Sequence, residues 1–150
     1  GEFEGGFKSF LGRLDVASAG VIGYNRNKAK AVPVGDYTEP QTKKHVRDVA
    51  KEMGIDFGKR TLVLPKEFAG SGIFGFTDNK SVILYPDAFS SRETLVKTIG
   101  HEYVHCQQIS EYGLVQDSVQ IGRFEREASA SEEKWWASYQ EKKSSNTKQD

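Results

Sequence analysis

TIGHEYVHCQQI, Thr98 to Ile109, is the stretch on which the interpretation of this chain depends. In it, His101 and His105 lie four residues apart, and Glu102 directly follows the first histidine. Residues four apart lie one above the other on a helix, so both imidazoles can reach one metal ion. Glu102 would lie about 100° further round the helix, close enough to act on a metal-bound water without being a ligand. The spacing therefore predicts a Zn²⁺ site with a water-activating carboxylate.

The residues around this motif predict an amphipathic helix. With His101 set at zero on a helical wheel, His105 falls at about 40° and Gln108 at about −20°. The apolar side chains fall between about 120° and 200°; they are Leu95, Ile99, Tyr103 and Cys106. We expect this helix to bury its apolar side and to line a cleft with its histidines. The alternative, a chance match on a surface helix, should arise in well under roughly one chain in a hundred of this length.

A third protein ligand is needed if zinc is to keep one coordination position open for water. Cys106 is the only cysteine, so a cysteine-ligated zinc site is excluded, and we expect it to be a buried free thiol. His45, the remaining histidine, is expected to be a solvated surface residue. The better candidates are two carboxylates in IGRFEREASASEEKWW, namely Glu125 and Glu127.

These two glutamates cannot share one role, because residues two apart point to nearly opposite sides of a helix. The helix face through Glu125 holds mostly apolar and small residues: Ile121, Ala128, Ser129, Glu132, Trp136 and Tyr139. The face through Glu127 is suited to water and holds Arg123, Ser131, Lys134 and Ser138. Ala128 is small enough to let two helices approach. We therefore expect Glu125 to point inward as the third ligand, with Glu127 as the alternative.

The sequences HEYVH on one helix and EREA on a later one resemble the gluzincin branch of zinc metallopeptidases. The resemblance covers roughly residues 81–136. It implies peptide-bond hydrolysis in a protein or peptide substrate, with zinc held by His101, His105 and Glu125 and with Glu102 as general base. It also implies that SVILY, residues 81–85, is an edge strand that lines the cleft and pairs with extended substrate. The third histidine of the metzincin pattern is missing from HCQQISEYG.

A second resemblance is to the compact metallopeptidase domains of bacterial polymorphic toxins and delivered effectors. It rests on the small size, the lack of a recognisable signal peptide and the glycine-rich N-terminal region. It implies a protein that is secreted or delivered as part of a larger chain, with a cognate inhibitor, or immunity, protein as a partner.

Zincins generally supply a hydrogen-bond donor for the oxyanion that forms on the attacked carbonyl. Tyr112 follows the motif helix and Tyr139 shares the face of Glu125, so both are candidate catalytic residues. The alternative for each is an aromatic side chain packed in the core with its hydroxyl satisfied. Glu132 could orient one of the histidines, the alternative being a solvated charge.

The remaining patterns predict a single α+β domain. We expect a zincin-like domain over residues 37–142, after a glycine-rich segment at 1–36 and before a disordered polar tail at 143–150. Thr38 is the expected cap of a first helix, Ser90 and Glu93 have the spacing of a capping box for the motif helix, and a third helix is expected over residues 118–142. Strands are expected at RTLVLP and in a hairpin over residues 72–86 that turns at 77–80. A small antiparallel sheet would then pack on the motif helix, and the glutamate-bearing helix would close the site.

Charge and hydropathy exclude other classes of protein. Lys plus Arg and Asp plus Glu both number 21, so the basic excess of a nucleic-acid-binding protein is missing. No run of about 18 apolar residues occurs, so no membrane span is expected. Two other functions stay open. One is a non-catalytic module in which the metal is structural or absent, and the other is a zinc amidase with a non-protein substrate, since the same water activation serves both hydrolyses.

Overall fold

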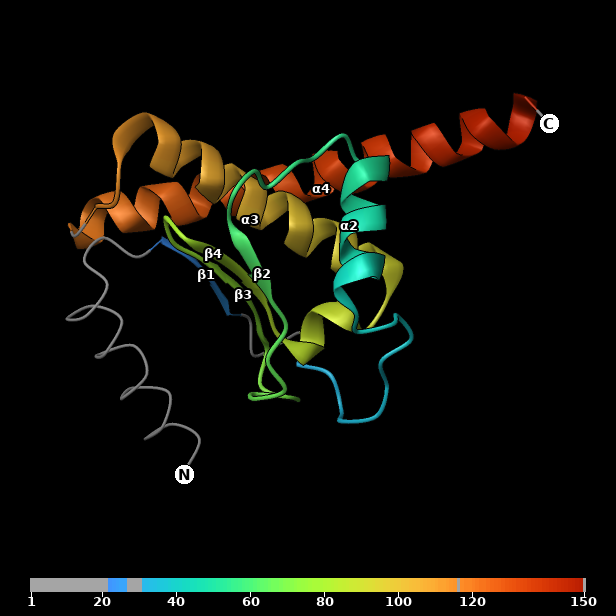
Figure 1. Cartoon of the computed structure of the whole chain (residues 1–150), viewed down its shortest axis with the longest axis horizontal. Coiled ribbons are helices and arrows are strands. Elements are labelled where there is room, and N and C mark those ends of the chain that lie inside the picture. Colours follow the sequence, from blue (N-terminus) through green and yellow to red (C-terminus); the bar gives the residue numbers. More distant parts are fainter. Residues whose placement is uncertain (1–21, 27–30, 116, 150) are drawn as a thin grey trace.

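The computed structural model describes residues 22–26, 31–115 and 117–149. Four strands and three helices make up most of it: β1 (Ile22–Arg26), α2 (Lys43–Glu52), β2 (Thr61–Val63), β3 (Ile73–Thr77), β4 (Ser81–Leu84), α3 (Arg92–Tyr112) and α4 (Ser118–Gln149). A short 3₁₀ helix, Pro86–Phe89, joins β4 to α3. α3 packs against β3 on one side and along α4 on another (Figure 1). The expected α+β architecture is confirmed.

The sheet has the strand order β1-β3-β4-β2 and is mixed. β3 is antiparallel to both β1 and β4, whereas β2 runs parallel to β4. The prediction of an antiparallel sheet is therefore wrong for β2, because the chain passes over β4 between β2 and β3. SVILY was expected at the edge, but β4 is an interior strand with a neighbour on each side. Among the described strands, β1 and β2 form the edges.

The hairpin between β3 and β4 agrees with the prediction. Asp78 closes its turn, because its carboxylate accepts hydrogen bonds from the backbone N–H groups of Lys80 and Ser81 at 2.8 and 2.7 Å. The backbone N–H of Asp78 in turn donates to the carbonyl of Ser81 at 3.1 Å. This turn could be predicted because the carboxylate that closes it bonds to residues only two and three positions further along the chain.

The caps of two helices differ from the predicted ones by a few residues. Thr42, not Thr38, caps α2, and the Thr38 hydroxyl instead donates to the carbonyl of Ser90 at 2.9 Å. Ser91, not Ser90, caps α3 by accepting from the backbone N–H of Thr94. In both places two capping residues lie within one turn, and tertiary contacts decide between them. α3 ends at Gly113, whose φ of 75° is a left-handed conformation that glycine adopts readily.

Both ends of the predicted domain need correction. The segment 1–36 was placed outside the domain, yet β1 within it forms part of the sheet; residues 1–21 and 27–30 lie outside the described ranges. The tail 143–150 was expected to be disordered, but α4 continues through Gln149. Lys142 donates to the carbonyl of Met53 at 3.3 Å and Lys143 pairs with Glu52. These lysines bind the C-terminal end of α2, where carbonyls lack helical partners, and so support the extra turns.

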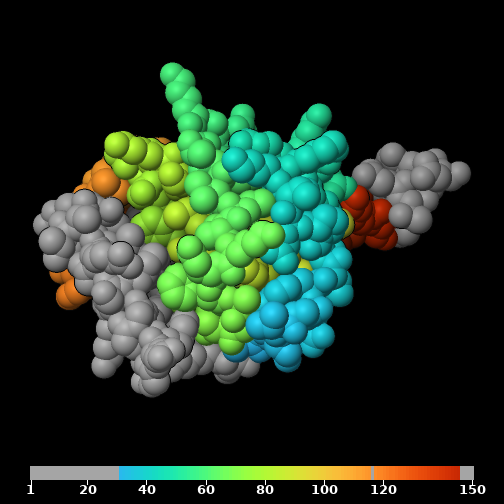
Figure 2. Space-filling view, turned by 60° about the horizontal axis from the view of Figure 1, so that its bottom comes forward, coloured from blue at the N-terminus to red at the C-terminus, as the bar shows by residue number. Residues whose placement is uncertain are grey.

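The hydrophobic core lies between α2, one face of the sheet and the apolar side of α3. Its members include Val46, Val49, Leu62, Val82, Leu84, Leu95, Val96 and Ile99. On the face shown in Figure 2, the blue-to-green part of the chain forms most of the coloured surface, and α3 (yellow) is visible only in small areas. Twelve of the 21 residues of α3 are buried, so it is a central helix with few exposed positions.

Burial of α3 also covers the side that was expected to line an open cleft. His101, Glu102 and His105 are all 0% exposed. Gly100 explains how α4 comes so close to this side, because a Cβ at that position would lie 2.2 Å from Cδ1 of Trp135. Ala128 on α4 is also fully buried, which agrees with the prediction that its small side chain lets the two helices approach.

Within the described ranges, none of the helices combines the length and the apolar character that crossing a membrane requires.

Candidate metal centre

Three side chains from two helices converge at the contact between α3 and α4. Nε2 of His101 lies 2.9 Å from Oε1 of Glu125, and Nε2 of His105 lies 2.7 Å from the same oxygen. One ligand atom from each of the three residues can be chosen so that all lie within 4.8 Å of one another. The structure therefore brings together the three residues that the sequence singled out as ligands.

The helices position these side chains by simple geometry. His101 and His105 are one turn apart on α3, and their ring centroids are 4.8 Å apart. The contact of Gly100 with Trp135 holds α4 close to this face of α3. Glu125 precedes the buried Ala128 by about one turn, so its carboxylate points at the histidine pair.

Each histidine also has a partner on its other ring nitrogen. Nδ1 of His101 lies 2.8 Å from Oε2 of Glu132, and Nδ1 of His105 lies 2.8 Å from Oε1 of Gln108. Such partners orient the imidazole of a metal ligand and leave Nε2 available to the metal. Glu132 thus occupies the orienting position that the sequence suggested for it. Gln108 was not predicted, although its wheel angle beside His105 was a signal for it.

Glu102 lies completely buried beside the cluster. The hydroxyl of Thr77, at the end of β3, donates to its Oε1 at 2.7 Å. Among the described residues, no donor lies within hydrogen-bond distance of its other oxygen, Oε2. Buried acceptors are rarely left without a donor, since this costs about 1–3 kcal/mol. The carboxyl group also interacts electrostatically with His101, Glu125 and Glu132. A buried carboxylate with an unpaired oxygen, so near this cluster, fits a site that receives a cation and water.

Gly75 on β3 provides the space for this carboxylate. A Cβ at position 75 would lie 2.7 Å from Oε2 of Glu102, closer than such contacts occur. Neither Gly75 nor Thr77 was predicted as a site residue, because both lie in the hairpin and only the packing of β3 on α3 brings them to Glu102.

The electrostatics of the cluster follow from burial and hydrogen bonding. Burial alone lowers the pKa of His101, but its hydrogen bonds to Glu125 and Glu132 outweigh this and raise the pKa to about 10. Burial raises the pKa of Glu125, yet hydrogen bonds from His101 and His105 bring the net pKa below its usual value. Burial raises the pKa of Glu102 well above that of a free glutamate. Before a cation binds, His101 and Glu125 therefore form an ion pair, and Glu102 holds a proton more tightly than usual.

Access to the cluster is from the side of α4. The side chain of Glu125 is 26% exposed and that of Glu132 is 18% exposed, whereas both histidines are 0% exposed. A ligand that reaches the histidines therefore passes Glu125.

The alternative ligand Glu127 does not face the histidines. It is exposed, and its Oε1 accepts from Nε2 of Gln108 at 3.3 Å. Of the two glutamates, the structure brings only Glu125 into the cluster, as expected for residues that point to opposite sides of α4.

Tyr139, one of the two candidate oxyanion donors, lies away from the cluster. It is fourteen residues beyond Glu125, or about 21 Å along α4. Its hydroxyl accepts from Nη1 of Arg92 at 2.7 Å and lies 3.3 Å from Oε1 of Glu52. The prediction of a catalytic role is wrong, because a shared helix face does not bring residues four turns apart to one site. Tyr139 instead ties α4 to α2 and α3.

Tyr112, the other candidate, is the last residue of α3 and is 58% exposed. Its ring stacks on that of Phe124, with centroids 5.3 Å apart. Among the described residues, no contact of Tyr112 with His101, His105 or Glu125 is found. Its catalytic role stays a prediction.

The other residues weighed as ligands have separate roles. His45 is not a solvated residue as expected: its Nε2 lies 2.9 Å from Oε1 of Glu39, and the pair is mostly buried. Cys106 is the buried free thiol that was predicted. Burial raises its pKa to about 12, so it is a poor metal ligand at neutral pH.

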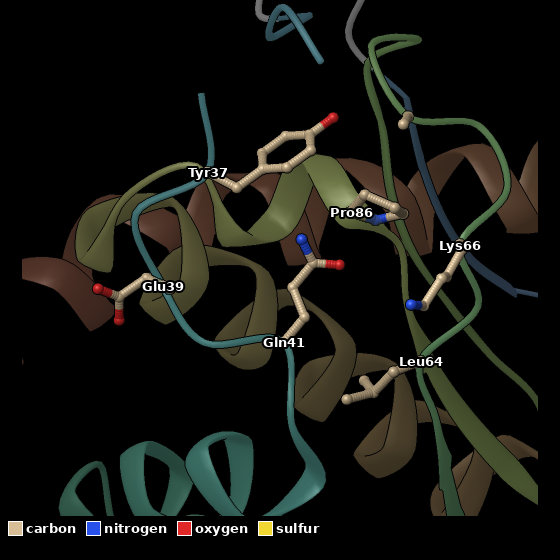
Figure 3. A pocket seen from close by; sticks show the side chains of 7 residues that line it. Tyr37, Glu39, Gln41, Leu64, Lys66 and Pro86 are labelled. Atoms are coloured by element: carbon tan, nitrogen blue, oxygen red, sulfur yellow. The ribbon is translucent and has the colours of Figure 1, made fainter. Parts of the chain in front are cut away.

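A separate pocket of about 400 Å³ is shown in Figure 3. It is lined by Tyr37, Glu39, Gln41, Leu64, Lys66, Ala69 and Pro86. Two of its walls are held by internal contacts: the Tyr37 hydroxyl donates to Asp87, and Glu39 pairs with His45 and Arg92. None of its lining residues belongs to the His101, His105 and Glu125 cluster.

Comparison of the chain with protein-family models, with curated proteins and with solved structures gives no match.

Proposed function

We propose that this protein is a zinc-dependent hydrolase that cleaves a peptide bond in a protein target. One observation carries the proposal: ligand atoms of His101, His105 and Glu125 lie within 4.8 Å of one another, beside a buried Glu102 whose Oε2 has no partner. The first three residues would be the ligands, and Glu102 would be the general base.

The donor set supports zinc over calcium and magnesium. Two imidazole nitrogens and one carboxylate oxygen are a common ligand set of catalytic zinc, and three protein ligands leave one position open. Calcium and magnesium prefer sites made of oxygen ligands alone. When bound, zinc would lower the pKa of a water in the open position and polarise the substrate carbonyl.

The chain's own residues would move the proton. Glu102 would accept a proton from the attacking water on Oε2 and then pass it to the leaving amine. Thr77 would hold the carboxylate through Oε1 and leave Oε2, which has no donor, to take the proton. Burial, which raises the pKa of Glu102, makes it a stronger base than an exposed glutamate.

β1 is the strand that could pair with an extended substrate. Among the described strands it lies at an edge of the sheet, next to β3. Ile22 of β1 is paired with Thr77, the residue that holds Glu102. A peptide added to this edge would run past the cluster and use backbone hydrogen bonds for affinity. β4, which the gluzincin resemblance implied for this role, has both sides occupied.

The role of toxin or effector is a further proposal that rests on the resemblance alone. A cognate inhibitor would cover the side of Glu125, from which the cluster is reached. Expression of the chain should then slow growth of the host cell, and co-expression of the inhibitor should restore it.

The direct test compares the wild-type protein with Glu102→Gln. We expect the purified wild type to bind one zinc ion and to cleave peptides from a mixed library, and the variant to bind zinc equally and to lose cleavage. Retained cleavage in Glu102→Gln would refute the mechanism.

The alternatives give different results in the same experiment. A wild type that binds no zinc would mean that the two histidines and Glu125 form an ion-pair cluster without a metal. The direct hydrogen bonds from both histidines to Glu125 are compatible with such a cluster. Zinc binding without hydrolysis would mean a structural metal. Cleavage of amides in cell-wall fragments, but not of peptides, would mean an amidase.

A further inference from the structure

Gln108 links a proposed metal ligand on α3 to the backbone of α4. It is 3% exposed. Its Oε1 lies 2.8 Å from Nδ1 of His105, and its Nε2 donates to the carbonyl of Phe124 at 3.1 Å and to Glu127 at 3.3 Å. The whole side-chain amide is therefore engaged, on one side with a ligand and on the other with the helix that carries Glu125.

The direction of each of these hydrogen bonds follows from the chemistry of the groups. The Phe124 carbonyl can only accept, so it requires an N–H group facing it. Nε2 of Gln108 is the amide atom with hydrogens, so the orientation of the amide is determined and Oε1 must face His105. An amide oxygen also only accepts, so Nδ1 of His105 must carry a proton. Nε2 of His105 is then the nitrogen left to bind a metal.

Nδ1 of His101 also carries a proton that a neighbouring acceptor holds, but the acceptor is a different group. The carboxylate of Glu132 accepts from its Nδ1. A carboxylate needs no further partner to define its direction, because both of its oxygens are acceptors. The neutral amide of Gln108 does need a further partner, because only one of its two ends can accept. The Phe124 carbonyl and Glu127 are that partner, since both accept from its Nε2. A neutral partner also adds no negative charge to a centre that already contains Glu102, Glu125 and Glu132.

We propose that Gln108 is a positioning residue that sets the tautomer of His105, directed by the Phe124 carbonyl, so that Nε2 of His105 is ready for the metal. This inference rests on the proposed metal site. It concerns the orientation of a ligand and not the chemical step, so it can be tested without measuring hydrolysis.

The first test is nitrogen-15 NMR of the histidine rings in the wild-type protein, with and without zinc. We expect a proton on Nδ1 of His105 in both states, exchanging slowly with solvent, and zinc on Nε2. An unprotonated Nδ1, or zinc bound through Nδ1, would overturn the proposal. If zinc does not bind at all, the proposed function fails, while the Nδ1 proton of the zinc-free protein still tests the role of Gln108.

The second test uses variants and a matched control. Gln108→Leu removes all three hydrogen bonds of the amide and should weaken zinc affinity by about 10–100-fold, as loss of such a partner generally does. It should also speed exchange of the His105 Nδ1 proton. Gln108→Glu keeps an acceptor for His105 but no donor for the Phe124 carbonyl. Its zinc affinity should therefore lie between that of the wild type and that of Gln108→Leu. Gln107→Leu, at the exposed neighbouring position, should match the wild type.

Zinc affinity is measured by competition with a chelator, and folding is checked by circular dichroism. Wild-type affinity in Gln108→Leu would contradict the positioning role and leave the metal site intact. Should Gln108→Leu fail to fold, the positioning role is tested by the NMR measurement on the wild type and by the zinc affinity of Gln108→Glu.

Discussion

Glu102 is a residue whose burial works against stability. Its carboxylate is fully buried, and only one of its oxygens has a hydrogen-bond donor. Because its pKa is raised in the folded state, the folded protein binds a proton there more tightly than the unfolded chain does. Stability from this group is therefore complete below the unfolded pKa of about 4.3 and falls as pH rises toward the folded value.

Glu102→Gln removes this ionisation and keeps an oxygen that can accept from Thr77. We expect the variant, without zinc, to be more stable than the wild type by about 1–3 kcal/mol at pH 8, with a smaller gain at pH 5. Urea unfolding at both pH values measures the difference, and the exposed Glu141→Gln is the control. A gain that does not increase with pH would show that burial of the charged form is not its cause.

The three residues of the cluster were predictable from the sequence, whereas their supporting residues were not. His101, His105 and Glu125 follow from helical periodicity, which depends only on local spacing. Thr77 and Gly75 reach Glu102 from β3, and no pattern in the hairpin indicates that contact. Gln108 shares the wheel position of the histidines, but its partners on α4 could be known only from the packing of the two helices.

At the scale of elements, the face of α4 decides which glutamate can bind a metal. Glu125 contacts both histidines, while Glu127 is exposed and contacts only Gln108 among the residues near the cluster. We expect Glu125→Ala to lower zinc affinity by more than the roughly 10–100-fold that loss of an outer partner costs. Glu127→Ala should stay within a few-fold of the wild type. Chelator competition measures both, and the reverse order would make Glu127 the ligand.

The approach of α3 to α4 is a second feature of the elements. A Cβ at Gly100 would meet Cδ1 of Trp135 at 2.2 Å, so Gly100→Ala should push the helices apart and move Glu125 from the histidines. We expect a loss of stability of about 1–3 kcal/mol and weaker zinc binding. Replacing Trp135 by alanine in the same chain should restore part of the zinc affinity, since it removes the clash.

Gly122→Ala, at a half-buried position of α4, is the control for Gly100→Ala, because a Cβ there would meet only the flexible end of Arg126, at 3.4 Å, and alanine favours a helix. Equal zinc affinity in Gly100→Ala and the wild type would mean that this contact does not set the position of Glu125.

Element boundaries were predicted less well than element types. The three helices and the β3–β4 hairpin follow from periodicity and turn residues, which are local signals. The parallel pairing of β2 with β4, the inclusion of β1 in the sheet and the extension of α4 depend on contacts between distant parts of the chain. Local patterns carry no information on such contacts, so the edge strand was assigned to β4 and the tail was expected to be disordered.

At the scale of the whole molecule, the proposed zinc binding would be linked to protonation and to folding. His101, whose pKa is raised to about 10, is protonated at pH 7 before zinc binds. The hydrogen bonds of charged His101 stabilise the zinc-free fold fully below its unfolded pKa of about 6.5, and this contribution is lost as pH rises through about 10. Zinc must displace the proton from Nε2, so its binding should release about one proton at pH 7.

Calorimetry of zinc binding in buffers with different ionisation enthalpies counts these protons. We expect the observed enthalpy to change with the buffer by the amount that corresponds to about one released proton, and zinc affinity to rise between pH 6 and 8. Zinc at 100 times its dissociation constant should stabilise the fold by about 2.7 kcal/mol. A binding enthalpy that does not depend on the buffer would contradict the ion pair between His101 and Glu125.

The central claim is that two imidazoles of α3 and one carboxylate of α4 hold a single zinc ion and leave a position for water. A crystal structure of the zinc-loaded protein, with anomalous data collected at the zinc absorption edge, tests it most directly. We predict one anomalous peak about 2.0–2.2 Å from Nε2 of His101, Nε2 of His105 and an oxygen of Glu125, with a water as the fourth ligand. No peak there, with the three side chains still hydrogen-bonded to one another, would contradict the claim.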